Sequence, residues 1–70
     1  MNLVTVVTRA IERIEATPED GLNAPGPYPE LAQDGRRWIK EGRYWFRYSV
    51  TMPPVIVAVF FETADLPGRA

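Results

Sequence analysis

Cysteine and histidine are both absent from this 70-residue sequence. Without them the chain cannot form disulfide bonds, the usual structural zinc sites or any catalytic triad that needs an imidazole. Long apolar runs are missing too, because the longest, Val55 to Phe61, is far too short to span a bilayer. We therefore expect a cytoplasmic protein that uses neither a metal nor another cofactor and does not enter a membrane.

The chain is short, and its charge is unevenly distributed. A chain of this length forms one small domain, near the lower limit at which a single hydrophobic core suffices, so a dimer or a bound partner is expected. Residues 1–35 carry two basic and six acidic side chains, whereas residues 36–70 carry six basic and three acidic ones. The basic half can attract a phosphate backbone or an acidic protein segment, and it can equally be a solvated strand face.

Residues 3–16 have the pattern of an amphipathic helix. Apolar positions recur at three- and four-residue steps, opposite Glu12, Arg13 and Glu15: they are Leu3, Val7, Ala10, Ile11 and Ile14. Asn2 can serve as the N-cap, and Thr17-Pro18 ends the helix because the residue before a proline is pushed out of the helical conformation. Residues 4–8 are β-branched and would also suit a strand. A strand is therefore the alternative to the first turns of the helix.

Residues 17–35 hold four of the seven prolines and three of the five glycines, which predicts a connection without regular structure. Tyr28 and Leu31 are its expected anchors, and residues 29–33 can form a single helical turn. The tail, residues 63–70, shows no periodicity, and we expect it to fray beyond Leu66.

Residues 36–61 are rich in β-branched and aromatic residues and contain two short breaks, which predicts antiparallel strands at 36–41, 43–51 and 55–62. The prolines of Met52-Pro53-Pro54 cannot donate to a ladder, so this segment is predicted to be a hairpin loop. The third strand is apolar on both faces and should be the most buried. The predicted fold class is α+β, with an N-terminal helix packed on a three-stranded antiparallel sheet.

Alternation divides the middle strand into two faces. The face assigned to the core holds Tyr44, Phe46, Tyr48 and Val50, and the face assigned to solvent holds Arg43, Trp45, Arg47, Ser49 and Thr51. Trp45 would then be at least partly exposed, and an exposed tryptophan beside arginine is typical of interface hot spots. We therefore predict that Arg43, Trp45 and Arg47 bind a partner, whereas Trp38 is expected to be buried.

The order of these features resembles a known toxin family. The helix ends in Ala-Ile-Glu-Arg-Ile-Glu-Ala-Thr-Pro-Glu, the middle strand begins at Gly42-Arg43-Tyr44, and Asp65-Leu66 follows the last strand. This resembles the second helix and the three C-terminal strands of the RelE/ParE toxins of bacterial type II toxin–antitoxin systems, so residues 1–70 are interpreted as a single RelE/ParE-like domain. The family's usual first strand and first helix have no counterpart here. The chain looks N-terminally shortened, and an uncovered sheet edge and helix face would favour self-association.

The resemblance implies two different activities within the family. Its ribonuclease branch cleaves messenger RNA on the ribosome with basic residues on the first two of these strands and an arginine after the last. Arg36, Arg37, Lys40 and Arg43 are the candidates for that site. However, Trp45 stands where the family commonly has arginine, residues 61–64 contain no basic side chain, and Glu62 would repel phosphate. A complete ribonuclease site is therefore not expected.

The leading hypothesis is a ParE-like toxin that acts by binding a protein. For that branch the resemblance implies DNA gyrase as the target, a role in plasmid stabilization, and neutralisation by a cognate antitoxin whose C-terminal segment wraps the toxin. The expected partners are this antitoxin, gyrase and a second copy of the chain. A RelE-like ribosome-dependent endoribonuclease and a vestigial, non-toxic antitoxin-binding protein remain as alternatives.

Overall fold

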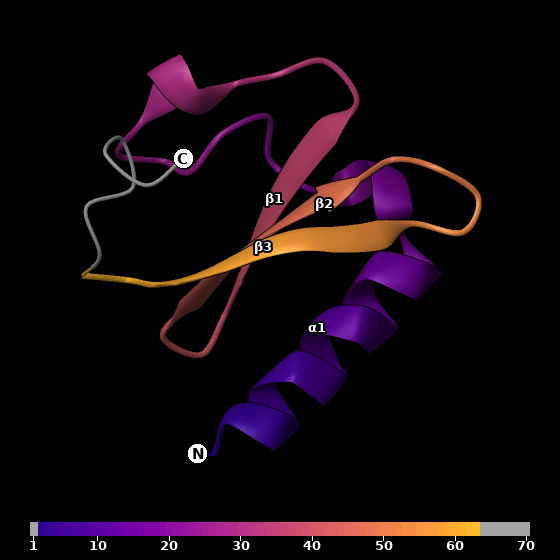
Figure 1. Cartoon of the computed structure of the whole chain (residues 1–70), viewed down its shortest axis with the longest axis vertical. Coiled ribbons are helices and arrows are strands. Elements are labelled where there is room, and N and C mark those ends of the chain that lie inside the picture. The colour runs from indigo at the N-terminus through magenta and orange to yellow at the C-terminus, as the bar shows by residue number, and fades with distance from the viewer. Residues whose placement is uncertain (1, 64–70) are drawn as a thin grey trace.

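The computed structural model describes residues 2–63 of the chain. Its elements in order are one α-helix, two short 3₁₀ turns and three strands, which form an α+β fold with the helix packed on an antiparallel sheet (Figure 1). This confirms the predicted fold class. The predicted fraying of the tail concerns residues outside the described range.

Helix α1, Leu3–Ala16, begins and ends where the sequence predicts. The side chain of Asn2 accepts a hydrogen bond of 2.8 Å from the backbone N–H of Thr5, which satisfies one of the free amides of the first turn. Buried side chains follow a four-residue step along the helix: Val6, Ala10 and Ile14. Because this row meets the sheet, burial outweighs the β preference of residues 4–8 and the alternative of a strand there is not realised.

The sheet contains β1, Arg36–Glu41, β2, Tyr44–Ser49, and β3, Val55–Phe61, in the order β1-β2-β3. Both neighbouring pairs are antiparallel, and the predicted hairpin loop with its two prolines joins β2 to β3. The middle strand is shorter than predicted, since residues 43, 50 and 51 lie outside it. On the face toward α1, Ile39, Phe46 and Tyr48 join the helix residues in the main hydrophobic core.

The prediction that the third strand is the most buried is wrong. Side chains of β3 alternate between exposed and partly buried, whereas β2 contains four buried residues: Trp45, Phe46, Tyr48 and Ser49. The physical reason is position, because β2 is flanked on both sides and β3 is an edge strand. An apolar strand is fully covered only when neighbours and packed layers exist on all sides.

The long connection covers the sheet face opposite α1. It contains the 3₁₀ turns η1, Pro18–Asp20, and η2, Pro29–Leu31, the second within the predicted helical turn. Tyr28 and Leu31 pack on Trp38 and Trp45 to form a second hydrophobic cluster. Both therefore act as the anchors that the sequence indicated, and the sheet lies between two apolar layers. None of the helices within residues 2–63 has the length and the apolarity needed to cross a membrane.

Candidate functional site

The four basic residues considered for a ribonuclease site do not form one cluster. Arg36 and Arg37 begin β1, whereas Lys40 and Arg43 lie near its other end. At about 3.3 Å per residue, the Cα atoms of Arg36 and Lys40 are about 13 Å apart along the strand. Alternation also directs Arg37 to the sheet face of its partner Tyr48, opposite the face of Arg36 and Lys40.

The second pair of basic residues, Lys40 and Arg43, is bound to a carboxylate. Glu62 lies 3.0 Å from Lys40 Nζ through Oε2 and 2.8 Å from Arg43 Nε through Oε1. The hydrogen bond from Arg43, followed by that from Lys40, holds the pKa of the Glu62 carboxyl below its ordinary value of 4.5. Glu62 therefore remains charged at neutral pH and neutralises the side chains that a phosphate would need.

The first pair of cations is also accompanied by acidic side chains. Arg36 and Arg37 line a polar hollow of about 500 Å³ together with Glu19 and Asp34. Arg37 Nη1 donates to Oδ1 of Asn23, which fixes this guanidinium against the connection. Two guanidinium groups and two carboxylates line the hollow. Their charges balance, so the hollow has no net positive charge with which to bind an anion.

We predict that removal of Arg43 raises the pKa of Glu62. Arg43→Gln takes away the largest cause of the shift, and Lys40→Met, which takes away the second, should raise the pKa less. Because the pKa is lowered in the folded state, the ion pairs stabilise the protein above the ordinary pKa of glutamate and are lost as the pH falls through the lowered value. Side-chain carboxyl chemical shifts measured against pH would test this. A Glu62 pKa that Arg43→Gln leaves unchanged would contradict the assignment.

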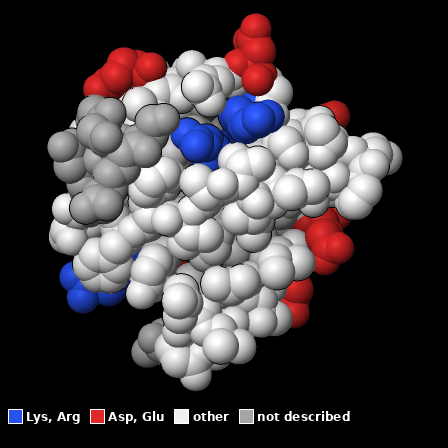
Figure 2. Space-filling view, viewed as in Figure 1, with Lys and Arg blue, Asp and Glu red and all other residues white. Residues whose placement is uncertain are grey.

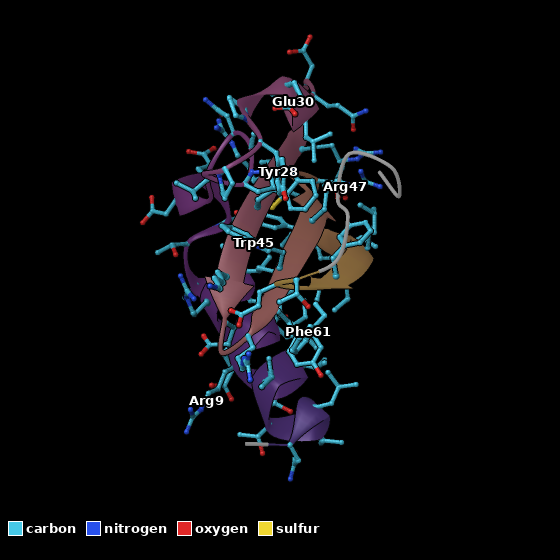
Figure 3. The ribbon with its side chains drawn as sticks, turned by 90° about the vertical axis from the view of Figure 1, so that its left-hand side faces the viewer. Arg9, Tyr28, Glu30, Trp45, Arg47 and Phe61 are labelled. Carbon is cyan, nitrogen blue, oxygen red and sulfur yellow. The ribbon has the colours of Figure 1, made fainter. Side chains whose placement is uncertain are left out.

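The predicted exposure of Trp45 is wrong. The side chain is only 8% exposed and lies in the second hydrophobic cluster with Trp38, under Tyr28 (Figure 3). The predicted burial of Trp38 is confirmed, since none of its surface is exposed. The solvent face assigned to the middle strand is therefore a packed face, and Trp45 does not present its indole to a partner.

Arg43 and Arg47, the other two predicted partner-binding residues, differ in exposure. Arg47 is half-buried, and its guanidinium lies 5.5 Å from the ring of Trp38 and 5.9 Å from that of Phe60. Its Nε is buried and has no hydrogen-bond partner within residues 2–63. Arg43 is exposed over 69% of its side chain, and it bonds to Glu62 and lies over the ring of Phe61. Of the three residues predicted to bind a partner, only Arg43 therefore lies on an open surface.

An apolar surface runs along β3 and the side of α1 that lies next to the start of β3. We call it the apolar surface, and its members, each at least 38% exposed, are Val55, Val57, Val59 and Phe61 of β3 with Val4 and Ile11 of α1. Figure 2 shows this side of the molecule as largely uncharged, with basic side chains on its upper part and acidic side chains at its margins. Exposed apolar side chains that gather on one side of a protein are typical of sites of protein association.

Two hollows border the apolar surface. One, of about 300 Å³, lies between α1 and the start of β3 and is lined by Ile11, Ile14, Glu15, Pro54, Val55 and Ile56. The other, of similar volume, lies at the far end and is lined by Val6, Gly42, Arg43, Tyr44 and Phe61. Arg43 therefore stands where the apolar surface meets a charged rim, which is the usual anatomy of a protein interface.

The sequence analysis did not predict that β3 is exposed, although the apolar pattern of the helix contains an indication of an uncovered surface. Val4 and Ile11, seven residues apart, form a helical row beside the buried row of Val6, Ala10 and Ile14. A helix with two adjacent apolar rows has more apolar surface than one narrow sheet can cover. That excess indicated an uncovered face on the helix, and the strand next to it completes the surface.

The described part of the chain contains no group of three or more acidic, cysteine or histidine side chains that could hold a metal ion. Comparison of the chain with protein-family models, with curated proteins and with solved structures finds no match. Among the described residues, the apolar surface and its charged rim are the features that indicate a function.

Proposed function

We propose that this chain is a ParE-like toxin component of a type II toxin–antitoxin system, which acts in the cytoplasm by binding a protein. The apolar surface carries the proposal, because β3 and α1 present side chains suited to protein contact. The helix-on-sheet architecture is compatible with the family that the sequence resembles. DNA gyrase is the target that this resemblance implies.

Neutralisation by an antitoxin suits the same surface. A flexible segment that folds on binding can cover an extended apolar face, and the cost of ordering it is met by a large contact area. The hollow between α1 and β3 offers such a segment a place for apolar side chains. At the other end Arg43, which is 69% exposed and bonded to Glu62, adds a polar rim to this contact.

The pairing of Glu62 with Lys40 and Arg43 weighs against the ribonuclease alternative. General acid–base and electrostatic catalysis of phosphodiester cleavage needs cations aimed at the developing negative charge. Here two of the four candidates are bound to a carboxylate, and Arg36 and Arg37 lie elsewhere. No observation favours this alternative over protein binding.

Induced expression in a bacterial host tests the proposal. We expect growth arrest with filamentous cells, a DNA damage response and intact transcripts. The matched control is Arg36→Gln with Lys40→Gln, which removes charge from β1 but leaves the apolar surface unchanged. This double variant should arrest growth as the unmodified protein does.

The other outcomes separate the alternatives. Arrest with cleaved transcripts, abolished in the double variant, would establish the ribonuclease and overturn the proposal. A folded protein whose expression causes no arrest would establish the vestigial reading. If growth arrest occurs but a target-specific assay shows that gyrase is unaffected, the proposal of a protein-binding toxin stands and gyrase is excluded as its target.

A further inference from the structure

The two edges of the sheet differ sharply. At the β1 edge, both backbone groups of Trp38 are bonded to Leu22 of the connection, at 2.7 and 2.8 Å. Arg13 of α1 donates to the carbonyl of Lys40 at 2.8 Å, and the amide of Arg36 donates to Gln33. This edge is closed by the chain itself.

The β3 edge is open over the described residues. The amide of Glu62 donates to the carbonyl of Arg43 at 2.8 Å, which directs the backbone groups of Glu62 toward β2. Because these directions alternate along a strand, the backbone N–H and C=O groups of Val59 and Phe61 point away from β2, toward the open edge. Neither residue has a backbone hydrogen bond on that side within residues 2–63.

The open edge lacks the features that normally prevent strand pairing. Natural edge strands are protected by charged residues, by proline or by a covering loop. All seven residues of β3 are apolar, and four of them are exposed: Val55, Val57, Val59 and Phe61. The irregularity in the β2–β3 register leaves Val57 without a partner in β2, whereas Ala58 to Phe61 pair regularly.

We propose that β3 is the site at which a second copy of this chain pairs, antiparallel and centred on Val59. This register places Val59 against its own counterpart and Val57 against Phe61 of the other copy. Ala58 then faces Phe60, so every cross-strand pair within the strand is apolar. The outward backbone groups of Val59 and Phe61 obtain the partners that they lack in one copy.

Charge favours a second copy over an acidic or basic partner segment. Residues 55–61 include no charged side chain that could select a charged strand, and an uncharged edge is complementary to another uncharged edge. The chain's net charge of −1 adds little repulsion between copies. In the antiparallel arrangement the Arg43–Glu62 pair of one copy lies beside the proline loop of the other, so like charges do not meet.

The pairing would also extend the apolar surface. Two antiparallel copies of one strand are related by a two-fold axis perpendicular to the sheet, so both α1 helices lie on the same face. The exposed row of Val4 and Ile11 from each helix then flanks the joined β3 strands. The inference does not depend on the toxin function, because it concerns the purified protein alone.

A charge-reversal pair at the two-fold axis provides the test. We expect the unmodified protein at about 100 μM to have twice the 7.9 kDa mass of one chain by light scattering. Val59→Lys and Val59→Glu should each be folded and should have half of that mass at the same concentration, because like charges at the axis raise the dimer dissociation constant. An equimolar mixture of the two should recover the dimer mass. Val4→Lys and Val4→Glu, on a helix residue that is 75% exposed, are the matched controls and should remain dimers.

Several results would overturn the proposal: a monomeric unmodified protein, dimeric Val59 variants, a mixture that stays monomeric, or Val4 variants that dissociate equally. If a Val59 variant does not fold, hydrogen exchange of the unmodified protein decides the question. The amides of Val59 and Phe61 should be protected at high concentration and should lose that protection on dilution. Protection that does not change with concentration would contradict pairing at this edge.

Discussion

Trp45→Ala is expected to reduce the free energy of unfolding by about 3–5 kcal/mol, as is usual when a large buried aromatic side chain is truncated. Trp45 is 8% exposed and packs with Trp38 beneath Tyr28 and Leu31. Its removal leaves a cavity at the place where the connection meets the sheet, so the anchors lose their contact surface. Thermal and denaturant unfolding monitored by circular dichroism would measure the loss.

Arg43→Ala is the matched control, since Arg43 lies on the same strand hairpin and is largely exposed. It should leave the melting temperature almost unchanged, because exposed ion pairs contribute little to stability. A Trp45→Ala protein that melts like the unmodified chain would show that the connection is not packed on this face. In that case Trp45 would again be a candidate for partner binding.

The success of the helix prediction has a local cause. The start of α1 is fixed by the Asn2 cap and its end by Thr17-Pro18, and both signals act within one turn of the chain. The strand limits likewise follow from short-range features, namely the two breaks and the alternation of side chains. Sequence patterns predict such elements well because the physical cause and the affected residues are close together in the sequence.

The errors concern the two faces of the sheet, which depend on contacts between distant residues. Alternation correctly separated Phe46 from Trp45, but it could not show that residues 21–34 fold back over the second face. Arginine on that face suggested solvent, whereas Arg47 lies on the rings of Trp38 and Phe60. The long aliphatic stem and flat guanidinium of arginine allow it to cover aromatic rings, so its presence does not define a wet face.

The candidate site was predicted only in part for the same reason. The sequence placed Arg43 on an accessible strand end and indicated that Glu62 would oppose phosphate binding, and the structure shows that these two side chains bind each other. The order of the strands is a tertiary property, and it decides that β3 lies at an edge. An apolar run such as residues 55–61 is equally compatible with a central strand and with an exposed edge that awaits a partner.

Tyr48→Ala is expected to cost about 3–5 kcal/mol of stability, because it removes a fully buried ring from the main core. The hydroxyl of Tyr48 donates a 2.6 Å hydrogen bond to the carbonyl of Pro18, which ties the end of α1 to the sheet. Gly21 lies so close that a Cβ there would approach Tyr48 Cε1 to 3.0 Å. The ring and the start of the connection therefore position each other, and chemical denaturation should show a single transition at lower denaturant concentration.

Tyr48→Phe separates the ring from the hydroxyl. It keeps the packing and loses the bond to Pro18, so we expect a smaller cost of about 0.5–1.5 kcal/mol. Burial raises the pKa of the Tyr48 hydroxyl above its ordinary value of 10.0. The folded state thus holds this proton more tightly than the unfolded state, and the resulting stability is complete below that value and lost as the pH rises through the raised pKa. Tyr48→Phe should remove this part of the alkaline loss of stability. Equal costs for the alanine and phenylalanine variants would show that the hydrogen bond, rather than the packed ring, holds the connection to the sheet.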